Sequence, residues 1–144
     1  MISIPKNPIT IGINSLIQNS YFEKFVDRKL PAYEVVITSQ YRDPKKNEAV
    51  GGVPYSAHQY GLATDFILKQ NGKKVPIEKA ESVYDEFVKP YWPGFSLFGK
   101  HKNDPQGYHI HVNLTRKISQ YTGIAVGVGL VGLALAYARK KRII

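Results

Sequence analysis

Residues 108–114 have the sequence YHIHVNL, in which polar and apolar side chains alternate without a break. Successive side chains of a β-strand point to opposite faces, so the pattern predicts a strand with one apolar, buried face. The other face carries His109 and His111, whose imidazoles then project from the same side. The segment therefore predicts a sheet with one face packed against the core and one polar face that carries the two histidines.

The sequence before this strand predicts helices and strands arranged around a single core. A chain of 144 residues has room for one domain of ordinary size. Hydrophobic spacing, with Asn14 as a plausible N-cap, predicts the following elements: a helix over 14–30, strands over 34–38 and 62–68, and an amphipathic helix over 77–89. Glycine and proline predict loops at 41–56, with room for a short helix, and at 93–107.

The C-terminal part differs sharply in composition, because residues 118–138 carry no charge. A helix of this length would reach roughly 30 Å, the thickness of a bilayer core. We therefore expect a domain over 1–117, a transmembrane helix over 118–138 and a basic tail over 139–144. Gly123 and Gly127 fit a pattern that supports helix–helix self-association. The alternative is a buried core helix, for which so small a domain offers little interior.

Composition narrows the function classes. The absence of cysteine excludes disulfides, thiolate metal ligands and a cysteine nucleophile. The formal net charge is +9, of which Arg139–Arg142 contribute four positive charges, and the other basic residues are scattered. Because no base-reading or aromatic stacking motif accompanies them, we expect no nucleic-acid partner. The N-terminal residues lack the apolar run of a cleaved secretory signal, so export by that route is not expected.

Three segments carry residues that suit a metal ion. His58 precedes Asp65 by seven residues, and His111 comes from the alternating strand. Zinc prefers nitrogen and oxygen ligands and keeps three protein ligands in catalytic sites. Taken singly, each of these residues also fits an ordinary hydrogen-bonded position, and His109 with His111 also fits a solvated strand face. His101 lies in the segment expected to be irregular, and the sequence indicates no partner for it.

The residue sequences of three motifs resemble those of a known protein family. SQYR at 39–42, SAHQYGLATD at 56–65 and HIH at 109–111 stand in this order. Together they resemble the M15 family of zinc D-Ala-D-Ala and L-Ala-D-Glu peptidases, which is marked by Ser-Gly-Tyr-Arg, Ser-x-His-x-x-Gly-x-Ala-x-Asp and a later strand with Glu-x-x-His or, as here, His-x-His. The resemblance covers about residues 34–114, and Gln40 stands where glycine is usual. It implies an α+β fold with a small antiparallel sheet that carries zinc and is flanked by helices.

The resemblance also implies a role for each matched residue. It makes His58, Asp65 and His111 the ligands of one zinc ion per chain, and it makes His109 the acid/base residue. A histidine two residues from a ligand on the same strand face is well placed to move a proton.

Two further residues are expected to meet the substrate. Arg42 is implied as a cation that contacts either the developing oxyanion or a substrate carboxylate, and its alternative is a surface ion pair with Asp43 or Glu48. Ser56 is expected to hydrogen-bond the substrate or a metal ligand. Gly61 is interpreted as small because ligand-bearing backbone passes close to the metal.

These implications predict a zinc-dependent peptidase that hydrolyses peptide bonds of bacterial peptidoglycan. The short chain and the missing signal favour a phage-type lytic endopeptidase over a D-Ala-D-Ala carboxypeptidase. Another alternative is a catalytically inactive, membrane-anchored module that keeps zinc and binds the wall. The expected location is a bacterial cell membrane or a virion membrane, reached by a single C-terminal span.

Overall fold

A long helix packs along one face of an antiparallel sheet. The computed structural model describes residues 8–52 and 56–114. The elements follow one another as α1 (Pro8–Lys29), β1 (Glu34–Ser39), α2 (Pro44–Ala49), the 3-10 turn η1 (Ala57–Tyr60), β2 (Ala63–Gln70), β3 (Lys73–Lys74), α3 (Ile77–Val83), the π-helical turn η2 (Tyr84–Val88), β4 (Phe95–Lys100) and β5 (Tyr108–Asn113). The main strands lie in the order β1-β2-β5-β4, and β3 pairs with β2. All pairings are antiparallel, so the predicted α+β class is confirmed.

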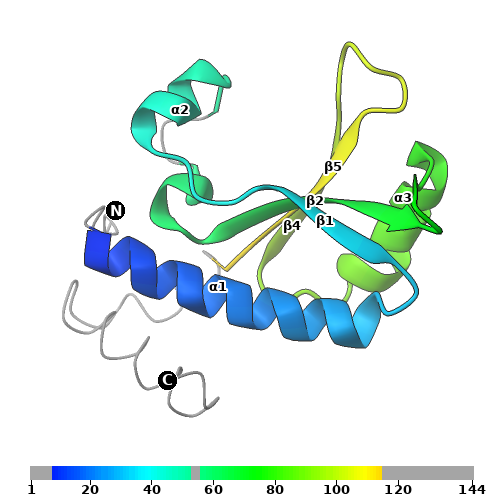
Figure 1. Cartoon of the computed structure of the whole chain (residues 1–144), viewed down its shortest axis with the longest axis horizontal. Coiled ribbons are helices and arrows are strands. Elements are labelled where there is room, and N and C mark those ends of the chain that lie inside the picture. Colours follow the sequence, from blue (N-terminus) through cyan, green and yellow to red (C-terminus); the bar gives the residue numbers. More distant parts are fainter. Residues whose placement is uncertain (1–7, 53–55, 115–144) are drawn as a thin grey trace.

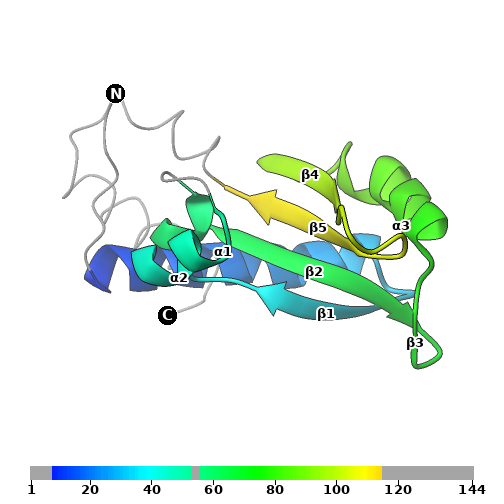
Figure 2. The same ribbon diagram turned by 90° about the horizontal axis from the view of Figure 1, so that it is seen from above.

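The two faces of the sheet differ as the alternation at 108–114 predicts. Ile110 and Val112 are fully buried on the face that packs against α1 and α3. Phe22 of α1 meets Phe66 of β2 edge to face, with ring centroids 5.2 Å apart. Burial of such side chains contributes about 1.5–3 kcal/mol each to folding. Figures 1 and 2 show α1 on this side, while α2 and the β4–β5 hairpin project from the other.

The first half of α1 is attached to the sheet by polar side chains. The Asn14 side chain donates to the Tyr60 carbonyl (2.9 Å), and Gln18 donates to Thr64 Oγ1 (3.2 Å) and to the Val112 carbonyl (3.3 Å). The prediction of Asn14 as an N-cap is therefore wrong, because the helix already begins at Pro8. Apolar spacing could not show this start, since the buried face is polar there. These hydrogen bonds fix η1 and β2 against α1.

The segment 93–107, expected to be irregular, contains a strand. Phe95–Lys100 forms β4 and pairs along its whole length with β5. Its sequence, FSLFGK, does not alternate clearly between apolar and polar residues. The apolar side chains of Phe95 and Leu97 lie on the more exposed face, where they are about half exposed, and Gly99 interrupts the pattern. The long-range pairing with β5 decides the structure here, and it is invisible to a local reading.

The remaining predicted elements lie close to their expected places. The short helix allowed within 41–56 is α2, and the amphipathic helix over 77–89 is α3 continued by η2. Within 8–52 and 56–114, no helix has both the length and the apolar character that a bilayer span requires. The expected transmembrane helix over 118–138 lies outside these ranges, as does the tail over 139–144.

Candidate metal centre

The turn η1 presents His58 to the sheet. The Ser56 hydroxyl accepts a hydrogen bond from the His58 amide (3.3 Å) and caps the turn, and Gly61 ends it with a left-handed conformation, φ +73°. A Cβ on Gly61 would lie 2.7 Å from the Ile11 carbonyl oxygen and 2.4 Å from Ser15 Oγ. Gly61 is thus small because the turn passes close to α1, which corrects the expectation that the metal requires it.

Neighbouring strands supply the other two members of the expected ligand set. Asp65 in β2 and His111 in β5 are directly paired across the sheet. Phe66 follows Asp65 in β2, Ile110 precedes His111 in β5, and both belong to the core that packs against α1. Because successive side chains of a strand point to opposite faces, Asp65 and His111 lie on the face opposite α1. Directly opposite side chains in an antiparallel pair lie about 4.5–5.5 Å apart at Cβ, so the sheet itself brings these two together.

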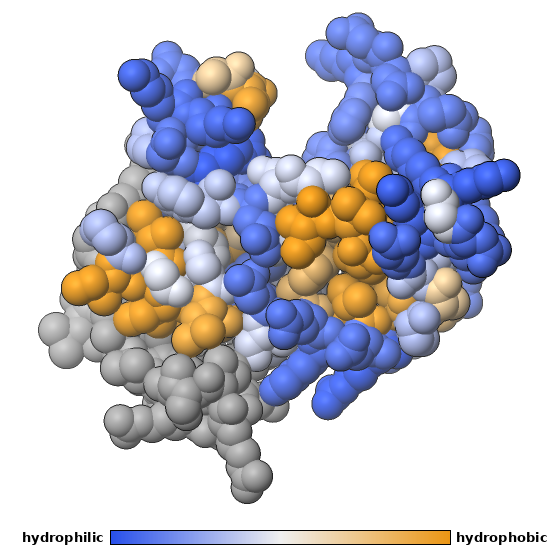
Figure 3. All heavy atoms as spheres, viewed as in Figure 1, coloured by the Kyte–Doolittle hydropathy of each residue, from blue (hydrophilic) through white to orange (hydrophobic). Residues whose placement is uncertain are grey.

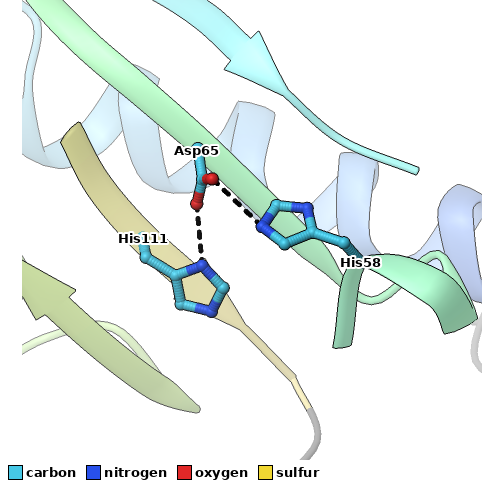
Figure 4. Close-up of side chains that lie close together, drawn as sticks. All are labelled: His58, Asp65 and His111. Carbon is cyan, nitrogen blue, oxygen red and sulfur yellow. Dashed lines mark hydrogen bonds and ion pairs between the residues drawn. The ribbon is translucent and has the colours of Figure 1, made fainter. Parts of the chain in front are cut away.

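Figure 4 shows the three side chains converging on one point. Asp65 Oδ1 lies 2.7 Å from His111 Nδ1, and Asp65 Oδ2 lies 3.1 Å from His58 Nε2. One ligand atom from each residue falls within 4.8 Å of the others. His58 is 1 % exposed and Asp65 is 9 % exposed. The structure thus places all three expected ligands in a single cluster.

The protonation of His58 favours a cation in this cluster. Its Nδ1 is hydrogen-bonded to the Gln40 carbonyl oxygen, which can only accept, so Nδ1 carries the proton. In the neutral ring, Nε2 then has a lone pair. Within residues 8–52 and 56–114 this buried atom has no hydrogen-bond donor beside it, and it faces a carboxylate oxygen. Two electron pairs at this distance repel each other unless a proton or a metal ion lies between them.

One of the two contacts with Asp65 has a separation that suits zinc, whereas Asp65 Oδ1 and His111 Nδ1 lie at a direct hydrogen-bond distance of 2.7 Å. Two ligand atoms that are each about 2.0–2.1 Å from a tetrahedral zinc ion lie about 3.3 Å apart. The contact of His58 Nε2 with Asp65 Oδ2 is 3.1 Å, close to that value. The Gln40 carbonyl supplies the outer hydrogen bond that fixes the tautomer of a metal-binding histidine. Gln40 can replace the glycine usual in the family because its side chain points away and donates to Asn19 Oδ1 (2.8 Å).

Asn113 provides the corresponding outer contact for His111. Its amide nitrogen lies 2.9 Å from His111 Nε2. Because an amide nitrogen can only donate, Nε2 accepts this hydrogen bond, and the proton on Nδ1 is donated to Asp65 Oδ1 (2.7 Å). Asn113 therefore holds the His111 ring with Nδ1 towards Asp65, where a bound metal ion would displace the Nδ1 proton.

The charge on Asp65 is well supported. Burial alone raises the pKa of its carboxyl group, but the hydrogen bond from His111, together with the hydrogen bond and the positive charge that His58 supplies when its ring is protonated, outweighs burial. The resulting pKa lies well below the ordinary value. Asp65 is therefore an anion at neutral pH, as a metal ligand must be.

Arg42 comes close to the same carboxylate. Its amide donates to the His58 carbonyl (3.0 Å), which fixes the segment after β1 against η1. The guanidinium Nη2 lies 3.9 Å from Asp65 Oδ2, and the side chain is 16 % exposed. Its Nε is buried and makes no hydrogen bond within the described part of the chain. Arg42 therefore lies beside Asp65 at the centre, and this position replaces the surface ion pair considered from the sequence. Its Nε remains available as a hydrogen-bond donor.

His109 lies beside the cluster on the same face of β5, two residues before His111. Burial lowers its pKa, and the neighbouring imidazoles act in the same direction, while the Asp65 carboxylate opposes them. The ring is therefore neutral at pH 7. Its Nδ1 lies 3.0 Å from Nε2 of His101. His101 therefore has a partner that could not be predicted from the sequence. Only the hairpin formed by β4 and β5 brings these two histidines together.

An open notch lies on the side of the molecule opposite α1. Figure 3 shows two hydrophilic projections with a hollow between them, and these correspond to α2 and the β4–β5 hairpin in the same view of Figure 1. Both rise from the face that carries Asp65 and His111. Phe95 and Leu97 of β4 add half-exposed apolar side chains to this face, and the Phe95 ring lies 6.1 Å from that of His111.

Comparison with known proteins gives a family for this arrangement. The profile of the family described as Peptidase M15 matches residues 10–88, which is more than half of the chain. The matched range contains Arg42, Ser56, His58 and Asp65, while His111 lies beyond it and reaches the cluster through the pairing of β2 with β5. No curated protein and no solved structure gives a significant match. The chain therefore belongs to the Peptidase M15 family.

Proposed function

We propose that this chain is a zinc-dependent peptidase that hydrolyses peptide bonds of bacterial peptidoglycan, and that it acts as a lytic endopeptidase of the phage type. The observation that carries this proposal is the buried contact between His58 Nε2 and the Asp65 carboxylate, which only a cation or proton can stabilise. Membership of the Peptidase M15 family supports the reaction class. The open notch suits a polymeric substrate better than a closed pocket would.

His58, Asp65 and His111 would hold the zinc ion. Zinc at this position supplies Lewis-acid chemistry, because it polarises the scissile carbonyl and lowers the pKa of a coordinated water molecule to about 7. His109 takes up the proton that the attacking water gives up. Since Nδ1 of His109 faces His101, the proton is accepted at Nε2 and later passed to the leaving amine.

Arg42 contributes the positive charge on the substrate side. Its guanidinium is mostly buried, lies near the centre and retains an unused donor. In this setting its hydrogen bonds can stabilise an oxygen that becomes negative during the reaction. Electrostatic stabilisation of this kind contributes about 2.7–4 kcal/mol for one donor in other hydrolases.

The position of Arg42 also supports a second candidate function, that of a D-Ala-D-Ala carboxypeptidase. A partly buried arginine with spare donors is also suited to a free terminal carboxylate, which such an enzyme must bind. In that case amidation of the terminal carboxylate should slow cleavage by the parent protein. The Arg42→Gln variant should lose this preference, because it no longer carries the charge that recognises the carboxylate. The inactive wall-binding module is less well supported, because His109 stands beside the ligand cluster on the same face of β5 and burial keeps its pKa low and its ring unprotonated at pH 7.

The experiment that tests the proposal is a digestion of purified peptidoglycan by the full-length, zinc-loaded protein in detergent. Mass spectrometry of the products identifies the new termini. We expect cross-linked fragments to be cut within their peptides; release of terminal D-Ala alone would instead identify the carboxypeptidase. His58→Ala protein prepared in parallel is the control. Absence of any product that depends on His58 would exclude both activities and leave the binding module.

A further inference from the structure

The β4–β5 hairpin brings together two histidines that the metal cluster does not use. His101 Nε2 lies 3.0 Å from His109 Nδ1, a normal hydrogen-bond distance. The ring centroids are 5.3 Å apart and the planes are inclined by 36°. The contact is therefore a hydrogen bond between two ring nitrogens of tilted rings and not a stacked pair. On the basis of the proposed function, we propose that His101 is a positioning residue that holds His109 in the tautomer required for hydrolysis.

The backbone of the hairpin fixes the distance between the two rings. The His101 amide donates to the Gly107 carbonyl (2.9 Å), and the Gly107 amide donates back to the Asp104 carbonyl (2.9 Å). The Gln106 amide also donates to Asp104 Oδ1 (3.0 Å). A Cβ at Gly107 would lie 2.9 Å from atoms of both His101 and Asp104, so the turn is tightly packed. His101 is thus placed by the main chain, although its side chain is exposed.

Gly99 makes room for the ring of His109. The two residues are directly paired between β4 and β5. A Cβ on Gly99 would lie 2.4 Å from Cε1, 2.7 Å from Nε2 and 3.0 Å from Nδ1 of His109. Such distances are far below van der Waals contact. The glycine therefore allows the imidazole to lie flat over β4, where it meets His101.

One proton lies between the two nitrogens, and its position decides what His109 can do. If His109 Nδ1 donates to His101 Nε2, then His109 Nε2 keeps its lone pair and can accept a proton from water. In the opposite arrangement His109 carries its proton on Nε2 and cannot act as the base. The exposed His101 can keep its own proton on Nδ1, in contact with solvent, and so offer Nε2 as the acceptor. Orientation of a catalytic base by a third group is the general logic of such sites.

The inference makes a specific forecast for substitutions at position 101. His101→Leu removes the acceptor, whereas His101→Gln retains one in its side-chain oxygen. In the full-length, zinc-loaded protein we expect His101→Leu to lower kcat about 10- to 100-fold, as loss of an outer-shell partner typically does. KM and zinc content should stay unchanged, because the contacts of His101 in the described part of the chain are with His109 and with the main chain of the hairpin. His101→Gln should recover most of the lost rate.

A purely structural role would not separate these two variants in this way. A second substitution, Gly99→Ala, should displace the His109 ring and mimic His101→Leu in kcat while the hairpin's own residues stay intact. In a His109→Ala background, His101→Leu should cause no further loss. A further loss of the same size there would show that His101 acts independently of His109 and would overturn the proposal.

The decisive readout is independent of activity. Long-range proton–nitrogen NMR of the His109 ring distinguishes the two neutral tautomers. We expect the proton on Nδ1 in the parent protein and a shift of population towards Nε2 in His101→Leu. If the parent carries the proton on Nε2, or if His101→Leu changes neither the spectrum nor kcat, the proposal is wrong. If the parent cleaves no peptidoglycan, the proposed function fails, while the ring spectrum still decides the pairing of the two histidines.

Discussion

The hydrogen bond from His58 Nδ1 to the Gln40 carbonyl is the single contact that most directly defines the chemistry of the centre. It fixes the ring's proton on the side away from Asp65 and directs a lone pair at the carboxylate. The motifs in the sequence suggest the three ligands, because His58, Asp65 and His111 stand at family-like positions. They cannot show which main-chain carbonyl orients a ring, since that depends on how β1 ends beside η1. Nor can they pair His101 with His109 across a hairpin.

The ligand set gives the first prediction. Replacing His58 or His111 by alanine removes one of three protein ligands, and we expect stoichiometric zinc to be lost in either variant. Metal analysis of the purified proteins after dialysis measures this. His101→Ala serves as a matched control, since this histidine is exposed and lies outside the predicted ligand set. Parent-like zinc content in both the His58 and the His111 variant would mean that the metal is bound elsewhere.

The second prediction concerns His109. His109→Ala should keep its zinc and its folding stability and lose about 10²- to 10⁴-fold in hydrolysis, the usual contribution of a general base. Steady-state kinetics together with metal analysis tests this separation of binding from chemistry. Turnover close to that of the parent would assign the base to another group.

At the scale of elements, the outcome depends on how far a segment relies on distant partners. β5 is recognisable from its alternation alone, because one of its faces is packed and the other is polar. β4 is not, since its site-facing positions are Phe95, Leu97 and Gly99, which give no alternation against its partly buried neighbours. The start of α1 was also missed, because its first buried positions are polar and bind η1 and β2. Prediction therefore failed where long-range hydrogen bonds replace hydrophobic burial.

The turn η1 gives a prediction at this scale. Gly61 and Gly72 have nearly the same positive φ, +73° and +75°, but only Gly61 faces atoms of another element. Alanine at Gly72 should cost about 1–2 kcal/mol for the left-handed backbone alone. At Gly61 the clash with α1 should add about 1–3 kcal/mol of overpacking. Urea unfolding of both variants measures the difference, and equal losses would show that α1 does not restrict the turn.

At the scale of the whole molecule, we propose that residues 118–138 anchor the enzyme in a membrane. The segment is uncharged, Arg116 and Lys117 precede it and four cations follow it. The larger positive cluster favours an interior C-terminus, which would direct the zinc domain outward, towards the wall. The basis of this proposal is the composition of the segment together with the expected wall substrate.

Truncation after Lys117 tests the anchor. We expect the full-length protein to stay with membranes through a carbonate wash and to need detergent for release. The truncated protein should appear in the soluble fraction. Recovery of the full-length protein in that fraction without detergent would support the alternative, in which residues 118–138 pack within the domain as a core helix.

The dependence of hydrolysis on zinc tests the central claim most directly. The full-length protein is stripped with a chelator, zinc is returned in steps, and the release of peptidoglycan fragments is measured at each step. The account predicts no release by the stripped protein and a rise that ends at one zinc ion per chain, with no recovery in His58→Ala at any zinc concentration. Full activity of the stripped protein, or equal recovery in His58→Ala, would contradict it.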